Sequence, residues 1–350
     1  MALSGAFKLF NEGDDVVKNI KSTISSGIWS GGSGTLTAFY SQSAQSSSTG
    51  EYFHDIYKTN PQTDSEAEIQ FSIAYGHRHG SGSLGTKGAT GDRTTAAIFG
   101  QFNNLINPPE TTAFKFQANT TSKQVYAIVF NRARMREAIE PGGWELRLHA
   151  GGAGTTTVKL IDDSSTNKGG NTDQRNFAPE YNVVSGTLSG GTSIKTAASA
   201  ETSGNGGSYG TFYPKLGVIL LNPERLQAAP LLMATVSASN TDNRNDLTFF
   251  KAIKSGSYFQ AKRQEEITSR HYFVRATANN FNSTTNETFY TESVSGVKQV
   301  ISGIRTDPRV YITTVGLYNG DSELLAIAKL SKPILKSKSR EALIKVKLDF

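Results

Sequence analysis

The sequence contains no cysteine, and this absence excludes several kinds of chemistry at once. Without thiols the chain has no disulfides, no thiolate-bound metal and no cysteine nucleophile. Tryptophan is scarce, with two residues in 350, so a sugar-stacking cleft of indole rings is not indicated. No apolar run reaches the roughly 18 residues of a membrane-spanning helix. The first ten residues lack the charged leader and long apolar run of a secretory signal. We therefore expect a protein that is made in a cytoplasm and makes no use of a membrane.

The composition also lacks the Leu, Lys and Glu richness that is typical of helical proteins. Hydrophobic residues make up 37% of the chain, and 34 glycines together with long Ser, Thr and Asn tracts require many turns and connections. The length admits two or more ordinary domains or one large all-β unit. We predict a mainly β fold of several short-stranded antiparallel sheets, sandwich-like or barrel-like, with long irregular loops and few short helices.

The last forty residues carry the clearest pattern. β-branched and aromatic residues predict a strand over 309–318, and a second follows over 323–330. Asn319-Gly320 is expected to supply the two positive-φ positions of a tight turn. Pro333 is expected to end the second strand, because proline cannot donate to a ladder.

A third strand is predicted over 342–350, where apolar and polar residues alternate up to the last position. This alternation places one set of side chains on the buried face and predicts that the carboxyl terminus is part of the fold. The residues expected to be buried are Ala342, Ile344, Val346, Leu348 and Phe350.

Most of the net charge lies in the same region. Seven basic residues oppose Glu341 and Asp349 between positions 329 and 349, which gives +5 of the total +6. Such residues serve solubility and edge protection, or they form a partner surface. No aromatic residue alternates with the lysines, so a nucleic acid is the less favoured partner. The interface candidates here are Lys336, Lys338, Arg340, Lys345 and Lys347.

The chain is divided by pattern into three parts. Residues 1–50 predict an extended N-terminal arm with short strands, in which 16–28 fits a helical stripe or a strand. Residues 51–300 predict a β-rich body with a loose Gly/Ser/Thr-rich insertion around 150–210. Residues 301–350 predict a hairpin and a terminal strand that packs on the body.

Within the body, four segments have a pattern of their own. Alternation predicts a strand with one dry face over 69–75, and an apolar run predicts a central strand over 125–130. Residues 99–106 have helical spacing, and 247–253 are assigned to a strand.

His77 and His79 stand two residues apart, so on a strand they share one face and could ligate a metal ion. No acidic neighbour completes a site nearby, and polar surface contacts are the favoured interpretation, with no cofactor expected. The following Gly80-Ser-Gly-Ser-Leu-Gly85 has the letters of a dinucleotide fingerprint. The residues after it do not begin a helix, so a flexible turn is the better interpretation.

Two further groups of charged residues are weighed as sites. Asp162-Asp163, and Asp242 with Asp246, are carboxylate pairs of the kind that glycoside hydrolysis uses, but no complete catalytic constellation accompanies them. The chain is therefore not expected to be an enzyme. Three alternating arginines could form an anion site, although ion pairs across a subunit interface are the simpler interpretation. They are Arg132, Arg134 and Arg136.

Four segments resemble virion structural proteins of contractile-tailed bacteriophages, notably myoviruses of cyanobacteria. They are 68–83 (EIQFSIAYGHRHGSGS), 141–146 (PGGWEL), 209–217 (YGTFYPKLG) and 309–350. The resemblance implies a component that is present in multiple copies and assembles with other virion structural proteins, in a virion built in the host cytoplasm. The expected place is the tail baseplate or the fibre-attachment region. The alternatives are a neck, collar or capsid-surface component, and a tail-associated carbohydrate-binding or depolymerase protein.

Overall fold

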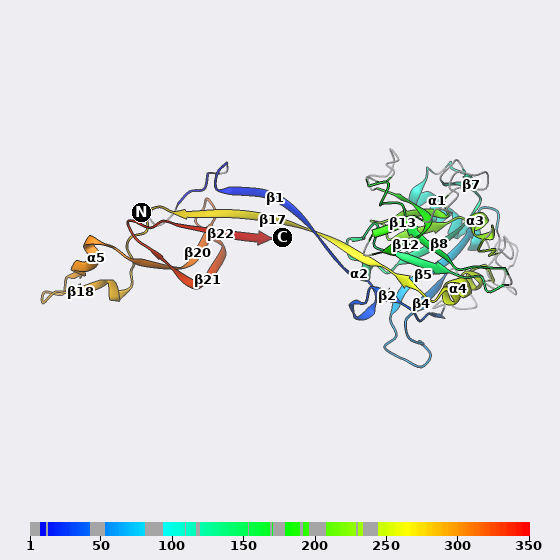
Figure 1. Cartoon of the computed structure of the whole chain (residues 1–350), viewed down its shortest axis with the longest axis horizontal. Coiled ribbons are helices and arrows are strands. Elements are labelled where there is room, and N and C mark those ends of the chain that lie inside the picture. Colours follow the sequence, from blue (N-terminus) through cyan, green and yellow to red (C-terminus); the bar gives the residue numbers. More distant parts are fainter. Residues whose placement is uncertain are drawn as a thin grey trace. The chain divides into compact units, whose positions relative to one another are not determined.

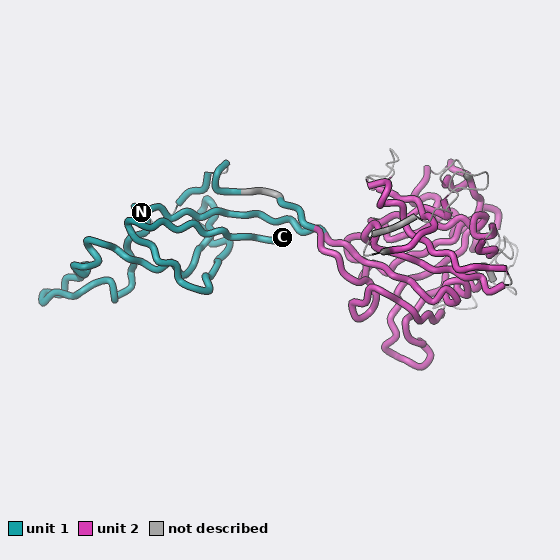
Figure 2. Tube along the Cα trace, in the orientation of Figure 1, with its two compact units in different colours: residues 1–22, 266–350 teal, residues 23–265 magenta. Residues whose placement is uncertain are grey.

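The computed structural model describes residues 8–11, 13–42, 53–80, 94–108, 110–116, 120–152, 154–168, 170, 179–189, 192–195, 208–228, 230–233 and 244–350. The chain forms two compact units, which Figure 2 shows in different colours. Unit 1 comprises residues 1–22 and 266–350, and unit 2 comprises residues 23–265. The protein is mainly β, as the composition predicts, and its strands pair antiparallel.

The division of the chain differs from the one drawn at positions 50 and 300. Strand β1 (Val16–Gly27) pairs with β17 (Lys262–Ala276), although some 240 residues separate them in sequence. This long-range pairing makes the N-terminal segment part of unit 1 together with the last 85 residues. Residues 16–27 are therefore a strand and not a helix, and 301–350 belong with unit 1.

Among the described residues, unit 2 is built on one large antiparallel sheet (Figure 1). Its order is β2-β16-β10-β11-β12-β14-β15-β8-β5-β4-β3, and β13 pairs with β12. The bounds are β2 Thr35–Leu36, β3 Tyr40–Gln42, β4 His54–Tyr57, β5 Ile69–His77, β8 Gln124–Phe130, β10 Glu145–Leu148, β11 Val158–Asp162, β12 Tyr181–Ser189, β13 Thr192–Lys195, β14 Gly210–Tyr213, β15 Val218–Leu221 and β16 Phe259–Gln260.

The sheet is curled around a buried aromatic centre. Phe71 on β5 and Phe259 on β16 have ring centroids 5.3 Å apart, although their strands are ninth and second in the sheet. Trp29 lies against both rings, and its indole Nε1 donates to the Phe259 carbonyl over 3.0 Å. A flat sheet would hold these strands about 30 Å apart, so curling is what brings their side chains into one core.

The other side of the sheet is covered as well, which corrects the prediction of a single dry face on 69–75. Ala74 on β5 belongs to a second apolar cluster with Phe99 and Phe102 of α1 (Thr94–Ile106). Gly76 permits this close approach, since a Cβ there would lie 2.7 Å from the Phe99 backbone nitrogen. The predicted helix over 99–106 and the central strand over 125–130 are confirmed.

The assignment of 247–253 to a strand is wrong, because these residues lie in helix α4 (Arg244–Gly256). Its apolar residues Phe249, Ala252 and Ile253 join the core inside the curled sheet. Their spacing of three and four residues also fits one face of a helix. Unit 2 further contains the short helices η1 Ser30–Gly32, α2 Arg132–Met135 and α3 Pro223–Gln227, and the short strands β6 Phe114–Phe116, β7 Thr120–Ser122 and β9 Ala138–Ile139.

Unit 1 contains two thin β layers. The first is the sheet β1-β17-β22, in which β22 spans Ala342–Asp349. The second is the hairpin of β20 (Val310–Tyr318) and β21 (Leu324–Lys336). One face of each layer meets the other in a small core around Val315, Leu317, Ile344 and Val346. The terminal strand pairs with β17 over Ser269–Ala276, the part of β17 that belongs to unit 1.

Two local predictions for the hairpin are wrong. Pro333 does not end the second strand, because the register shift between Ile312 and Thr314 leaves the proline outside the ladder and pairing resumes at Ile334. The turn is longer than two residues, and the residue with positive φ is Ser322. The side chain of Asn319 organises it by accepting from the backbone N–H groups of Asp321 and Glu323.

The remaining elements of unit 1 lie between β17 and β20. They are η4 Glu287–Phe289, the paired strands β18 Tyr290–Glu292 and β19 Lys298–Val300, and α5 Ser302–Thr306. Among the described residues, no helix has the length and apolar character to span a bilayer.

Candidate functional site

The exposed apolar residues of the described chain are concentrated in unit 1. Eleven of the sixteen large hydrophobic residues that are exposed belong to it, although it has 107 of the 350 residues. Isolated exposed apolar side chains are ordinary, but a contiguous group marks a site of interaction. The eleven are Leu9, Ile20, Val294, Val297, Tyr311, Tyr318, Leu324, Leu325, Ile327, Leu343 and Phe350.

Four of these residues form a group that we call the hairpin outer face: Tyr318, Leu324, Leu325 and Ile327. Tyr318 stands opposite Leu324, and Ile327 stands opposite Gly316, on the side of β20–β21 away from the small core. A Cβ on Gly316 would lie 2.9 Å from the Tyr318 ring and 3.3 Å from Leu324, so both side chains lie over this glycine. Leu325 is 67% exposed and Ile327 is 66% exposed.

The sequence contained a signal for this surface. Residues 324–328 read Leu-Leu-Ala-Ile-Ala, so apolar side chains occupy both faces of the strand. Ala326 and Ala328 pack against the small core. The larger Leu325 and Ile327 therefore point outward, the reverse of the usual arrangement in a soluble sheet.

The predicted basic surface lies on the other layer of unit 1. Lys345 and Lys347 are exposed on β22, opposite Phe273 and His271 of β17, while Ile344 and Val346 on the other face are buried. Lys347 pairs with Asp349 at 2.9 Å. A hydrogen bond from the Ser269 hydroxyl, followed by the Lys347 ammonium, lowers the pKa of Asp349.

Phe350 is 66% exposed, which corrects its assignment to the buried face. It follows the last residue of β22, where its ring lies 5.5 Å from the guanidinium carbon of Arg270. The alternation along β22 is otherwise as predicted, with Leu348 partly buried.

Lys336 is not available as a surface group. Its side chain is fully covered, and its Nζ donates to Asn282 Oδ1 at 2.5 Å and to the Ala278 carbonyl at 3.2 Å. Burial lowers the pKa of Lys336, and the charge of Glu341 opposes this effect. Lys338 and Arg340 are exposed in the turn that joins β21 to β22, so they remain candidates for a partner.

The three arginines of the body do not converge on one anion site. Arg132 donates to the Lys215 carbonyl at 3.0 Å, and Arg136 pairs with Glu265 at 3.0 Å. Arg134 is the most buried of the three and binds the Ile69 carbonyl and the Glu68 carboxylate. All three therefore contact groups of unit 2 itself.

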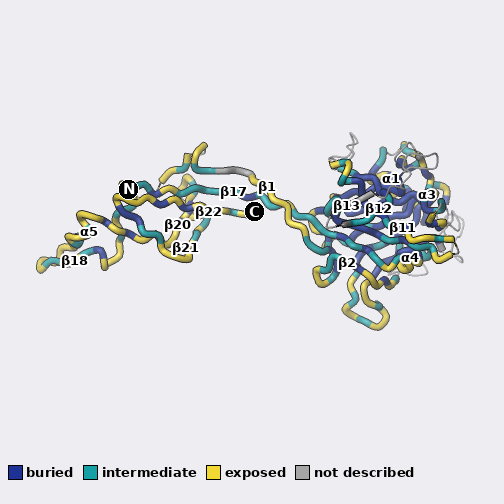
Figure 3. Tube along the Cα trace, viewed as in Figure 1, coloured by how far each residue is buried: buried dark blue, intermediate teal, exposed yellow. Residues whose placement is uncertain are grey.

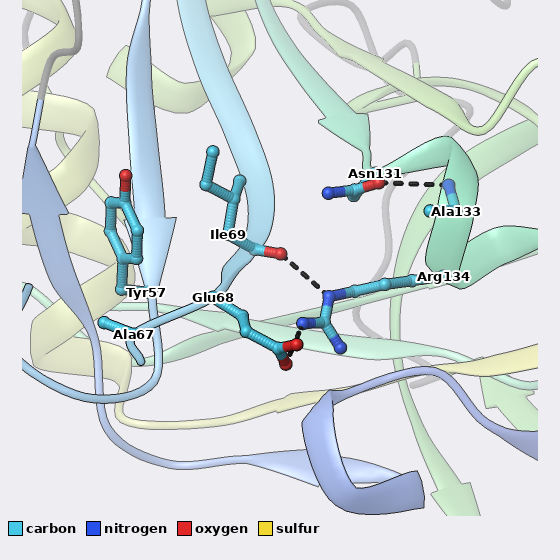
Figure 4. Close-up of a pocket in the computed structure, with 7 residues that line it drawn as sticks. All are labelled: Tyr57, Ala67, Glu68, Ile69, Asn131, Ala133 and Arg134. Carbon is cyan, nitrogen blue, oxygen red and sulfur yellow. Dashed lines mark hydrogen bonds and ion pairs between the residues drawn. The ribbon is translucent and has the colours of Figure 1, made fainter. Parts of the chain in front are cut away.

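Arg134 also borders a shallow open depression of about 560 Å³. Figure 4 shows Tyr57 and Ala67 on one side, Arg134, Ala133 and Asn131 on the other, and the Glu68–Arg134 ion pair between them. Asn131 is held at the start of α2 by a hydrogen bond from Ala133 N–H. The ion pair satisfies much of the charge in this pocket, which leaves little net charge for a ligand to recognise.

His77 and His79 do not share a strand face, because β5 ends at His77 and His79 follows in a turn. The backbone N–H of His79 donates to His77 Nδ1 at 3.1 Å, and the ring centroids are 6.3 Å apart. Burial, and then the neighbouring His79, lower the pKa of His77. Within the described part of the chain, no three His, Cys, Asp or Glu side chains are grouped so that they could hold a metal ion.

The buried carboxylates hold loops of unit 2 in place. Asp162 accepts from the backbone N–H groups of Gly142 and Ser164, and burial raises its pKa. Asp163 accepts from the backbone and side-chain nitrogens of Asn182. Asp246 lies in the first turn of α4, and Asp242 lies outside the described residues.

Sequence reasoning missed one such group. Glu145 accepts from Arg147 and from the backbone N–H of Leu188, and it is buried although in sequence it alternates with the apolar Trp144 and Leu146.

Comparison of the chain with models of known protein families, with curated proteins and with solved structures finds no match.

Proposed function

We propose that this chain is a structural protein of a contractile-tailed bacteriophage virion and that it works by assembling with other virion proteins. The observation that carries the proposal is the surface of unit 1, where large apolar side chains stay in contact with water on both thin layers. Exposed apolar groups of this size are unfavourable in a free protein and are typical of protein–protein contacts.

The strand edges of unit 1 support the same function. β1 and β22 are the outer strands of their sheet, and β20 and β21 pair only with each other among the described residues. Unpaired edges present N–H and C=O groups that an added strand can use. In Figure 3 exposed residues recur along β20, β21 and β22, whereas buried residues predominate in the strands of unit 2.

The resemblance to virion proteins supports assembly as the function of these surfaces. Its longest segment, 309–350, comprises the hairpin and the terminal strand, which are the elements that carry the exposed apolar and basic side chains. Within a virion we place the protein at the baseplate or fibre-attachment region. A position at the neck, collar or capsid surface uses the same surfaces with different neighbours.

Immunoelectron microscopy of intact particles of the phage that encodes the chain tests this proposal. An antibody raised against unit 2 should label the tail end, and pre-absorption with the purified protein should remove the label. Label at the neck or capsid would contradict the baseplate position. Absence of the chain from purified particles by mass spectrometry would contradict the virion assignment altogether.

A further inference from the structure

The hairpin outer face has opposite charges at its two ends. Exposed acidic residues, Asp321 and Glu323, lie at the turn end of the apolar group, and exposed Lys329 and Lys332 lie at the other end. Lys329 is two residues along β21 from Ile327, which is about 7 Å in a strand. The surface is therefore an apolar centre between an acidic end and a basic end.

We propose that the hairpin outer face binds the same face of a second copy of this chain, about a two-fold axis. This inference rests on the proposed assembly function and identifies one partner as a second copy of the chain. Isologous contacts of this kind need a surface that is complementary to itself, and an apolar centre between opposite charges meets this requirement.

The charges also determine the direction of the axis. The two-fold axis lies in the plane between the two packed faces. If it runs perpendicular to the strands, the acidic turn of each copy lies over the lysines of the other. An axis parallel to the strands would place Asp321 over Asp321 and Lys329 over Lys329, which like-charge repulsion disfavours. We therefore infer an antiparallel arrangement, with the two hairpins about 10 Å apart in the manner of packed sheets.

The area of the group indicates the strength of the contact. Four large side chains that are about half to two thirds exposed present on the order of 400 Å² of apolar surface. A standard stable interface buries roughly 800 Å² on each partner. The hairpin contact with its charged rim falls below this size, so we expect a reversible dimer of the purified chain that becomes persistent when many copies are held in one particle.

Sedimentation equilibrium of the full-length chain, at concentrations up to about 100 µM and at low salt, tests the proposal. Wild type should show a monomer–dimer equilibrium, and Ile327→Glu should weaken it by a factor of about 100 or more, because the charge would be buried at the centre. Val294→Glu is the matched control, since Val294 is exposed in unit 1 outside the hairpin outer face. It should dimerise as wild type does.

A charge exchange tests the direction of the axis without altering the apolar centre. Asp321→Lys and Lys329→Glu should each dimerise about fivefold or more weakly than wild type, because each homodimer brings like charges together at both ends. An equimolar mixture of the two variants should recover near wild-type affinity, since both contacts of the heterodimer are then between opposite charges. Raising the salt to 1 M should remove these differences.

Several results would overturn the inference. A monomer throughout the concentration range would do so, as would unlimited association, dimerisation of Ile327→Glu equal to wild type, or a mixture no tighter than its components. Each of these leaves the virion assignment standing if microscopy still finds the chain in the particle. The reverse result, a dimer of the predicted kind in a chain absent from virions, would overturn the proposed function alone.

Discussion

Unit 2 and unit 1 are both antiparallel β structures, but they differ in how many faces of their strands are covered. In unit 2 the curled sheet has Trp29 and α4 on one side and α1 on the other, so β5 and β8 are buried almost throughout. In unit 1 each layer buries one face against the other. Unit 2 has the core of an independently stable domain, whereas unit 1 leaves large apolar side chains exposed, which we propose are covered by a partner.

The largest expected effect tests the core of unit 2. Trp29→Ala should lower its free energy of unfolding by about 3–5 kcal/mol, because the indole contacts three aromatic rings and donates a buried hydrogen bond. Both tryptophans belong to unit 2, so fluorescence of the remaining Trp144 in a urea titration reports its unfolding. Leu216→Ala, at an exposed site of unit 2, is the control and should change stability by less than about 0.5 kcal/mol. Equal losses in the two variants would contradict the description of the core.

The next effect tests the small core of unit 1. Ile344→Ala should lower the free energy of opening of β20, β21 and β22 by about 2–4 kcal/mol, and Leu343→Ala, at the exposed neighbouring position, should lower it by less than about 0.5 kcal/mol. Hydrogen exchange of the amides in these strands measures the opening. The fluorescence transition of unit 2 should not move in either variant. A loss that spread to unit 2 would show that the two units do not unfold separately.

A smaller effect concerns the buried ammonium of unit 1. Lys336→Met should cost about 1–2 kcal/mol, because the Asn282 oxygen loses its donor. The pH dependence has a definite sign. The folded state holds the pKa of Lys336 below its usual value of 10.5, so in that window the unfolded chain binds more protons. Stability of wild-type unit 1 should therefore rise with pH as it passes through the lowered pKa towards 10.5, relative to Lys336→Met.

Hydrogen exchange of wild type and Lys336→Met between pH 8 and 10.5, corrected for the intrinsic exchange rate, measures this difference in the pH dependence of stability. Lys338→Met, at the exposed position two residues further on, is the control and should keep the wild-type slope. Identical slopes in wild type and Lys336→Met would show that this lysine is not held in a low-pKa environment.

The smallest effect compares two arginines of one short segment in unit 2. Arg134→Ala should cost about 1 kcal/mol, because its side chain is 14% exposed and holds the Ile69 carbonyl as well as Glu68. Arg136→Ala removes an ion pair whose arginine is 56% exposed, and it should change stability by less than about 0.5 kcal/mol. Urea titration followed by tryptophan fluorescence measures the free energy of unfolding of both variants. A larger loss for Arg136 than for Arg134 would contradict the assignment of Arg134 as the buried contact.

Strand character was predictable wherever a local pattern governs it. β-branched residues and alternation identified β5, β20 and most of β22, and helical spacing identified the second half of α1. The pattern failed for 247–253, because a short apolar run fits a strand or a helix equally well. Here the helix is formed because its apolar residues pack in the core inside the curled sheet. It failed again at Pro333, because a bulge in an edge strand removes the need for a donor.

The candidate surface was predictable in part. Exposed Lys345 and Lys347 follow from the alternation of β22, but the hairpin outer face was not singled out, since apolar residues on both sides of a strand indicate complete burial as readily as a docking site. The metal interpretation of His77 and His79 assumed that the strand continues past His77, whereas the chain turns there.

What the sequence determined by itself is local: which segments are extended, where the charge lies, and which chemistries the absence of cysteine excludes. The acidic turn and basic stem of the hairpin are also visible there. Only the tertiary structure decided which face of each strand is covered, because cover comes from residues distant in sequence. Lys336 is enclosed by a loop 54 residues away, whereas Phe350, with the same apolar character as buried Val346, has no such cover. Burial is a property of the neighbours, and the sequence pattern alone does not name them.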